Sequence, residues 1–180
     1  MKLLVDFVLI GIIVGFISHG NFRNLKQANI PYLWLIVLGF VVKFIGPYFS
    51  ESSFQWFNII GMIIVFIGTL FSYKSYGMKI VSVGAFLNIL VIVFNRGMMP
   101  VWLPMVQRLQ LNDLAAHLES GLYLDYTLLK ASTRLPFLGD TLPYYSIIMR
   151  RPFVISIGDY LLGIGLIAFI IFYMRKEYPS

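Results

Sequence analysis

Two aspartates in the C-terminal part of the chain have the spacing that acid–base chemistry would need. Asp140 follows Gly139 in a proline-flanked segment, and Asp159 follows Gly158, 19 residues later. Two carboxyl groups held close together acquire different pKa values, so one can act as a base and the other as an acid on a bound water molecule. The pair predicts catalysis by Asp140 and Asp159 if the protein is an enzyme, in the manner of an aspartic hydrolase.

The same two residues also have a structural interpretation. Asp159 lies where a long apolar segment begins, so its carboxylate could accept backbone amides at the N-terminus of a helix. Asp140 could pair with an arginine or a lysine. A catalytic pair instead requires both carboxylates within hydrogen-bond reach of one water. Both interpretations stay open from the sequence.

Six further polar residues complete the predicted site. Ionisable and amide side chains inside or beside apolar spans are costly, so each needs a partner or a function. Because successive spans alternate in direction, these residues and the two aspartates should meet at one membrane face, in one polar pocket. We expect Lys43 to lie near Asp6 or Asp159, and the arginines to attract a phosphate or carboxylate group or to contact lipid phosphates. The six residues are Asp6, Lys43, Asn88, Asn95, Arg96 and Arg134.

Several other chemistries are excluded by composition. The chain has no cysteine and two histidines among 180 residues. Disulfides, thiolate catalysis and Cys-based zinc sites are therefore absent, and no metal site or cofactor is expected. The net charge of +6 is typical of lysines and arginines that contact anionic lipid, so membrane lipids are the expected partners and nucleic acid is not.

The overall composition indicates an integral membrane protein. Hydrophobic residues make up 59% of the chain and charged residues 12%, and the mean hydropathy is +0.82. Soluble domains have about 45–50% apolar and about 25% charged residues. This balance argues against a soluble globular domain and against a disordered chain.

The apolar residues lie in five segments that are candidate membrane spans. A helix needs roughly 20 apolar residues to cross the hydrocarbon core. We therefore predict a single all-α domain over residues 1–180, a bundle of five transmembrane helices. The spans cover approximately residues 3–18, 31–48, 54–73, 78–95 and 153–174.

A long loop of residues 96–152 separates the last two spans. It holds ten of the 22 charges and five of the eight prolines. Within it, residues 104–119 have helical spacing of apolar positions, which predicts one amphipathic helix at the membrane interface. The loop is too apolar for a solvated linker, so we expect it to fold back over the ends of the helices.

The short loops predict the orientation. Basic residues in short loops favour the cytoplasmic side. On this basis the N-terminus lies outside and the C-terminus inside, in the cytoplasmic membrane of a bacterium. The residues that set this orientation are Arg23, Lys26, Lys74, Lys79, Arg175 and Lys176.

Three segments resemble an uncharacterised family of small multi-pass bacterial membrane proteins, a family of unknown function. This resemblance covers the whole chain and implies no activity. The segments are residues 95–101 (Asn-Arg-Gly-Met-Met-Pro-Val), 133–140 (Thr-Arg-Leu-Pro-Phe-Leu-Gly-Asp) and 154–159 (Val-Ile-Ser-Ile-Gly-Asp).

The last two spans alone are similar to lipoprotein signal peptidases. Asp140 and Asp159 match the spacing of that family's two catalytic aspartates, which implies a membrane hydrolase with an aspartate dyad. Other matching positions are Gly84, Ala85, Asn88 and Gly165. The sequence departs from the family motif at Ser156 and Gly158, where the family has Asn and Ala, and it lacks the Asp-Arg pair expected after Asn88.

Two classes of function therefore remain. The favoured one is a nonenzymatic membrane protein, either a subunit of a larger membrane complex or a binder of a lipid or other amphipathic ligand. Its ligand would lie in the polar pocket at the outer face, under residues 96–152. The alternative is an intramembrane hydrolase with an aspartate dyad. The contacts of Asp140 and Asp159 are the feature that discriminates between them.

Overall fold

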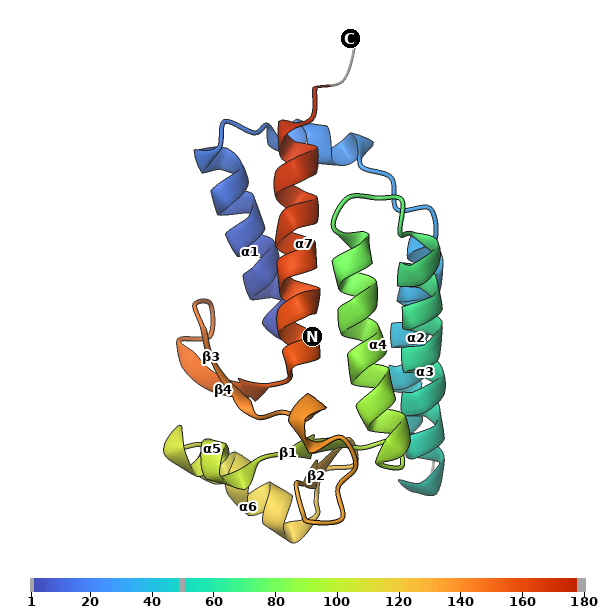
Figure 1. The fold of residues 1–180 in the computed structure, drawn as a ribbon, viewed down its shortest axis with the longest axis vertical. Helices are drawn as coiled ribbons and strands as arrows, with labels where there is room; N and C mark the ends of the chain where they lie inside the picture. The colour runs from blue at the N-terminus through green and yellow to red at the C-terminus, as the bar shows by residue number, and fades with distance from the viewer. Residues whose placement is uncertain (1, 49–50, 178–180) are drawn as a thin grey trace.

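Five long helices lie side by side in a computed structural model that describes residues 2–48 and 51–177 (Figure 1). The contacts between helices give the order α1, α7, α4, α3, α2 across the molecule. The last helix in the chain therefore packs between the first and the fourth. The helices are α1 (Lys2–Ile17), α2 (Leu33–Ile45), α3 (Glu51–Phe71), α4 (Met78–Phe94) and α7 (Ile157–Arg175).

The chain is mostly helical, as expected, and each predicted span overlaps one of these helices. Two segments, Ser53–Phe71 and Ile157–Arg175, are long and apolar enough to cross a membrane. Helices α1, α2 and α4 have only 16, 13 and 17 residues, which at 1.5 Å per residue is roughly 20–26 Å. The fifth helix begins at Ile157, later than predicted, because the preceding residues form a strand.

Glycines allow two pairs of helices to approach closely. A Cβ at Gly39 would lie 2.6 Å from the carbonyl oxygen of Gly61, across the α2–α3 contact. A Cβ at Gly84 would lie 2.6 Å from the carbonyl oxygen of Gly158, across the α4–α7 contact. Any larger residue would push these helices apart, which is the usual reason for small residues between apolar helices.

Residues 96–156, called the lid below, lie across one end of the helices (Figure 1). Strands β1 and β2 pair in parallel, and β3 and β4 form an antiparallel hairpin. Short 3-10 helices also occur at Phe22–Gln27 (η1) and Gly46–Tyr48 (η2). The lid contains β1 (Met99–Val101), α5 (Leu103–Arg108), α6 (Asn112–Ser120), β2 (Tyr126–Leu128), η3 (Pro136–Leu138), β3 (Leu142–Ser146) and β4 (Arg151–Ile155).

The lid corrects two sequence-based expectations. The fold is not purely all-α, because the lid holds two small sheets. The predicted amphipathic helix over residues 104–119 is two helices, since the chain turns at Gln110, where φ is 56°. The turn lets Val106 and Leu118 pack together with Val101 and Val154. The lid thus has a small hydrophobic core of its own, which a straight helix could not form.

Candidate functional site

Asp159 caps the N-terminus of α7. Its backbone amide donates to the hydroxyl of Ser156 at 2.9 Å, and its Oδ2 accepts from the amide of Ser156 at 3.3 Å. Asn88 on α4 donates to Asp159 Oδ1 at 2.8 Å and accepts from the Ser156 hydroxyl at 2.8 Å. Both carboxylate oxygens of Asp159 are therefore engaged, in a reciprocal capping arrangement that joins α7 to α4.

Asp140 lies in the lid and is held by its backbone. Its amide donates to the carbonyl of Pro100 at 2.8 Å, and its carbonyl accepts from the amide of Trp102 at 3.0 Å. The residue is only 6% exposed. Its Oδ1 is buried and has no hydrogen-bond partner among the described residues. A buried polar atom of this kind calls for a proton, a water or a ligand group.

The surroundings of Asp140 are acidic. Burial raises the pKa of Asp140 well above its usual value, and the negative charges of Asp159 and Asp125 raise it further. Lys43 acts in the opposite direction and lowers the pKa. Burial and the charge of Asp140 also raise the pKa of the Tyr126 hydroxyl. This environment favours the neutral acid form of Asp140 over the carboxylate.

Asp6 joins α1 to the lid hairpin. The carboxylate is fully buried, and its Oδ1 accepts from the amide of Ile148 at 3.1 Å. Its Oδ2 and the Tyr144 hydroxyl are both buried without a hydrogen-bond partner among the described residues. Burial and the nearby Asp6 raise the pKa of Tyr144 to about 12. The tyrosine therefore stays protonated as a donor that faces an acidic neighbour.

Two asparagines attach the lid to α3 and α4. Asn95 donates to the backbone carbonyl of Arg134 at 2.8 Å and accepts from its amide at 3.1 Å. Asn58 donates to the carbonyl of Gly97 at 2.7 Å. Only the backbone of Arg134 therefore takes part in these contacts. The side chains of Arg134 and Arg96 are exposed. These asparagines serve as hydrogen-bond links between helices and lid.

The expected pairing of Lys43 with Asp6 or Asp159 is not seen in the part of the chain that the structure describes. Lys43 lies on α2, which packs mainly against α3, whereas Asp6 lies on α1, which packs mainly against α7. Within residues 2–48 and 51–177, no ion pair joins Lys43 to Asp6 or Asp159. Lys43 is partly buried, and its effect in the site is the electrostatic one on Asp140.

The predicted residues consequently fall into two groups. Asp6, Asn88, Asn95 and Asp159 hold the lid and α7 in place through hydrogen bonds. Asp140 is buried among further carboxylates, with Lys43 as the cation that acts on it. Asp6 and Asp140 are thus buried, whereas the side chains of Arg96 and Arg134 are exposed at the surface.

A cavity of about 260 Å³, half open to the surface, lies in the lid between α6 and β2. Apolar and polar side chains share its wall. Tyr126 lines the cavity, and the negative charge of Asp140 raises the pKa of its hydroxyl. The cavity therefore lies within electrostatic range of Asp140. The lining residues are Met98, Leu118, Glu119, Ser120, Gly121, Tyr123, Tyr126, Thr127, Leu128 and Lys130.

Three residues of this region were missed from the sequence. Ser156 stands three positions before Asp159, which is the spacing of a capping box, and this signal was available. Asp125 and Tyr126 had no such signal. Their position depends on the pairing of β1 with β2, whose strands are three residues long.

Comparisons with known proteins place the chain in a family. A protein of Thermotoga maritima described as uncharacterised is 27% identical over 181 aligned residues, which cover 99% of this chain and 95% of the relative. No solved structure matches the chain. Residues 25–171 match the family described as Family of unknown function (DUF5317). This confirms the resemblance to a family without a known function, and the chain belongs to DUF5317.

Proposed function

We propose that the chain is a multi-pass membrane protein in which all five long helices cross the bilayer. Large apolar side chains are exposed on every one of these helices, for example Ile17, Trp34, Trp56, Val83 and Ile164. Exposed apolar surface over so much of a protein is a burden in water and a requirement in lipid. In this proposal the short helices α1, α2 and α4 are completed by their flanking segments or by local thinning of the bilayer.

The distribution of charge supports the orientation with the lid outside. The end opposite the lid holds six basic residues and one acidic residue, Glu177. The remaining seven acidic residues lie in the lid or in the lid-side half of the helices. A basic end in short segments belongs on the cytoplasmic side.

We propose that the function is nonenzymatic and that the lid binds an amphipathic ligand. The observation that carries this is the lid cavity, whose wall combines Leu118 and Leu128 with Glu119 and Lys130. A volume of about 260 Å³ fits a head group or a short amphiphile rather than a whole lipid. Hydrogen bonds attach the lid to the helices, since Asp6 accepts from the amide of Ile148 and Asn58 and Asn95 donate to backbone carbonyls of the lid.

The test is binding by the purified protein and by a variant whose cavity is filled. Native mass spectrometry of the detergent-solubilised protein should detect a co-purified lipid or amphiphile, and Thr127→Phe should lose it. Ser132→Phe is the matched control, because Ser132 is an exposed lid residue outside the cavity. A ligand at 100 times its Kd stabilises the folded state by about 2.7 kcal/mol, so heating should distinguish the two variants. Equal ligand content in both variants would contradict the proposal.

An aspartate-dyad hydrolase is the second candidate. It is favoured by the unpartnered Oδ1 of the buried Asp140, which has Asp159 among its charged neighbours. It is disfavoured by Asp159, both of whose oxygens are engaged by Asn88 and Ser156. Catalysis would require Asp159 to exchange one of these bonds for a water.

The hydrolase candidate is tested with a synthetic lipid-modified signal peptide, whose cleavage is followed by mass spectrometry. A hydrolase would cleave the peptide, and both Asp140→Asn and Asp159→Asn would abolish cleavage. Asp113→Asn, on the exposed face of α6, is the control. No cleavage by the parent protein, or cleavage that survives Asp140→Asn, would remove this candidate.

A further inference from the structure

The hairpin of β3 and β4 turns back from the lid towards the helices (Figure 1). Its strands pair as far as Ser146 and Arg151, so residues 147–150 form the turn at its end, called the hairpin tip below. In Figure 1 the hairpin tip lies beside the N-terminal end of α1, at the edge of the molecule. The residues that line the lid cavity do not include any of the hairpin tip.

The hairpin tip is unusually apolar for a turn. Ile147 and Ile148 are 58% and 47% exposed, and Tyr145 beside them is 61% exposed. Turns that face water are usually formed by Gly, Pro, Asn, Asp and Ser. Isoleucines at the end of a hairpin therefore indicate a surface that is covered by something apolar.

Arg150 adds a positive charge to the hairpin tip. Its φ of 51° lies in the left-handed region, where glycine or asparagine would fit without strain. The side chain is exposed, and within the described part of the chain its guanidinium forms no ion pair. An anionic group outside the protein can therefore reach it.

Hydrogen bonds fix the hairpin tip against α1. The amide of Ile148 donates to Oδ1 of the buried Asp6 at 3.1 Å, and the amide of Met149 donates to the hydroxyl of Ser146 at 3.0 Å. Backbone amides that enter an apolar phase need such partners. These two bonds hold the exposed isoleucines in a defined place and make the turn compatible with lipid.

The level of the hairpin along the bundle follows from two helices. Asp6 is four residues after Lys2, the first residue of α1, so its bond to Ile148 lies about 6 Å from the start of that helix. Tyr160 stands in the first turn of α7, and its hydroxyl donates to the carbonyl of Pro143 in β3. Both contacts place the hairpin about one turn inside the lid-side ends of the helices.

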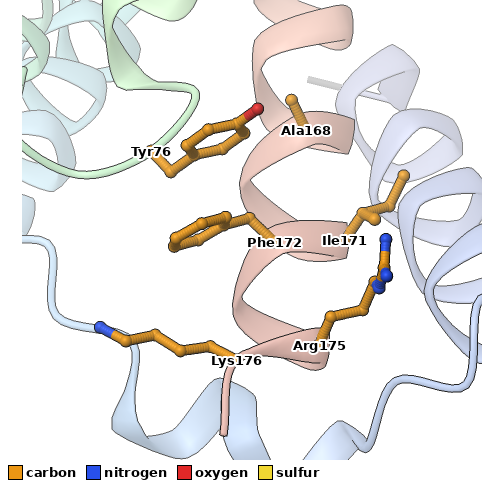
Figure 2. A pocket seen from close by; sticks show the side chains of 6 residues that line it. All are labelled: Tyr76, Ala168, Ile171, Phe172, Arg175 and Lys176. Atoms are coloured by element: carbon orange, nitrogen blue, oxygen red, sulfur yellow. The ribbon is translucent and has the colours of Figure 1, made fainter.

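The opposite end of α7 has the residues of a lipid–water boundary. Tyr76 and Phe172 stack there with ring centroids 4.2 Å apart, and Figure 2 shows Arg175 in the next turn of the helix. Aromatic and basic side chains at one level are typical of that boundary. The 19 residues of α7 are about 28 Å long, close to the hydrocarbon thickness of about 30 Å. A helix of this length that crosses the bilayer begins at the outer boundary, so Tyr160 and the hairpin beside it lie within the lipid.

We propose that the hairpin tip is inserted into the outer leaflet of the bilayer and attaches the lid to the membrane beside α1. Ile147 and Ile148 lie among the acyl chains, and Arg150 lies among the phosphate groups. Val5 and Leu9, on the same two turns of α1 as Asp6, are also exposed and extend this apolar surface. This inference rests on the proposed membrane insertion of the helices.

The test measures the depth of single nitroxide spin labels on the full-length protein in vesicles of phosphatidylglycerol and phosphatidylcholine. The chain has no cysteine, so each label can be attached to one introduced cysteine. Collision with oxygen, which concentrates in lipid, is compared with collision with a nickel chelate that stays in water. Labels at Ile147→Cys and Ile148→Cys should collide mainly with oxygen and lie about 5–10 Å below the phosphate groups, the depth of apolar faces at an interface. A label at Arg150→Cys should lie closer to the phosphates.

Two reference positions calibrate the measurement. Ile13→Cys, on the exposed apolar surface of α1, should also collide mainly with oxygen. Ser120→Cys, exposed at the end of α6 on the far side of the lid, should collide mainly with the nickel chelate (Figure 1). All these positions are exposed, so the circular dichroism spectra of the labelled proteins should match that of the parent.

Three results would overturn the inference. Hairpin labels that behave like Ser120 while Ile13 stays in lipid would refute insertion of the hairpin tip and leave the spanning helices intact. Hairpin labels shielded from both reagents would mean that a second copy of the chain covers the tip in place of lipid. A nickel-accessible label at Ile13 would refute membrane insertion of the helices as well.

Discussion

Replacement of Asp140 by asparagine should stabilise the protein at neutral pH. The carboxyl group is buried, its Oδ1 has no partner among the described residues, and Asp159 and Asp125 repel its charge. The pKa of Asp140 is therefore raised well above the usual 3.8, and the folded state binds this proton more tightly than the unfolded chain does. Stability is unaffected below about pH 4 and falls as the pH rises from there towards the raised pKa.

The size of the stability change is limited because a single proton on Asp140 is involved. A single group changes the free energy of unfolding by at most about 1.4 kcal/mol per pH unit within this window. The asparagine of the variant has no proton to lose, so the stability of the variant should lack this fall. The difference between variant and parent should thus be small near pH 4 and grow towards pH 7. Lys43 opposes the effect, because its positive charge lowers the pKa of Asp140.

The assay is thermal unfolding in detergent, followed by circular dichroism at a series of pH values. Asp113→Asn makes the same chemical change at an exposed position of α6 and should stay within about 0.5 kcal/mol of the parent at every pH. A parent protein whose stability does not depend on this carboxyl between pH 4 and pH 7 would refute a neutral, buried Asp140. So would an Asp140→Asn protein that is markedly less stable than the parent at neutral pH.

Three further changes test how the lid and α7 are held. Asn95→Ala removes two hydrogen bonds to the backbone of Arg134 and should lower the free energy of unfolding by about 1–3 kcal/mol. Trypsin should then cut faster after Arg134, and an unchanged cleavage rate would count against this link between α4 and the lid. Ser156→Ala removes the N-cap of α7 and the bond to Asn88 and should lower stability by about 1–2 kcal/mol in thermal unfolding, an expectation that fails if the melting temperature is unchanged. Gly158→Ala places a Cβ against the side-chain amide of Asn88 and 2.8 Å from the carbonyl oxygen of Gly84 and should cost about 1–3 kcal/mol, whereas Ile164→Ala on the exposed face of the same helix serves as the control.

The helices could be predicted from the sequence because long apolar segments leave few alternatives. Where the segment has a defined cap, as Ser156 and Asp159 provide for α7, even the first residue of the helix was within reach. The strands were not. Residues 99–101 pair with residues 126–128 across an intervening pair of helices, and three residues are too short for a recognisable alternation of apolar and polar positions.

For the candidate site, the sequence predicts which end of the helices its residues share, but not which of them are in contact. Because consecutive helices alternate in direction, Asp6, Asn88 and Asp159 are expected at one end of the helices, and all three make contacts there. The alternating directions do not indicate which helices are neighbours, and the sequence therefore could not show that α2, with Lys43, packs against α3 while α1 and Asp6 pack against α7. Nor does the sequence show that the side chains of Asn58 and Asn95 form hydrogen bonds with backbone groups of the lid.

The sidedness of the lid and of the basic end is the most direct test of the proposed membrane protein. The chain has no cysteine, so single cysteines can be introduced at Ser120 in the lid and at Lys74 between α3 and α4 without a background signal. A membrane-impermeant maleimide applied to intact cells should label Ser120→Cys, and should label Lys74→Cys only after the membrane is opened. Labelling of both positions from the same side, or recovery of the protein in the soluble fraction, would contradict a five-span protein with the lid outside.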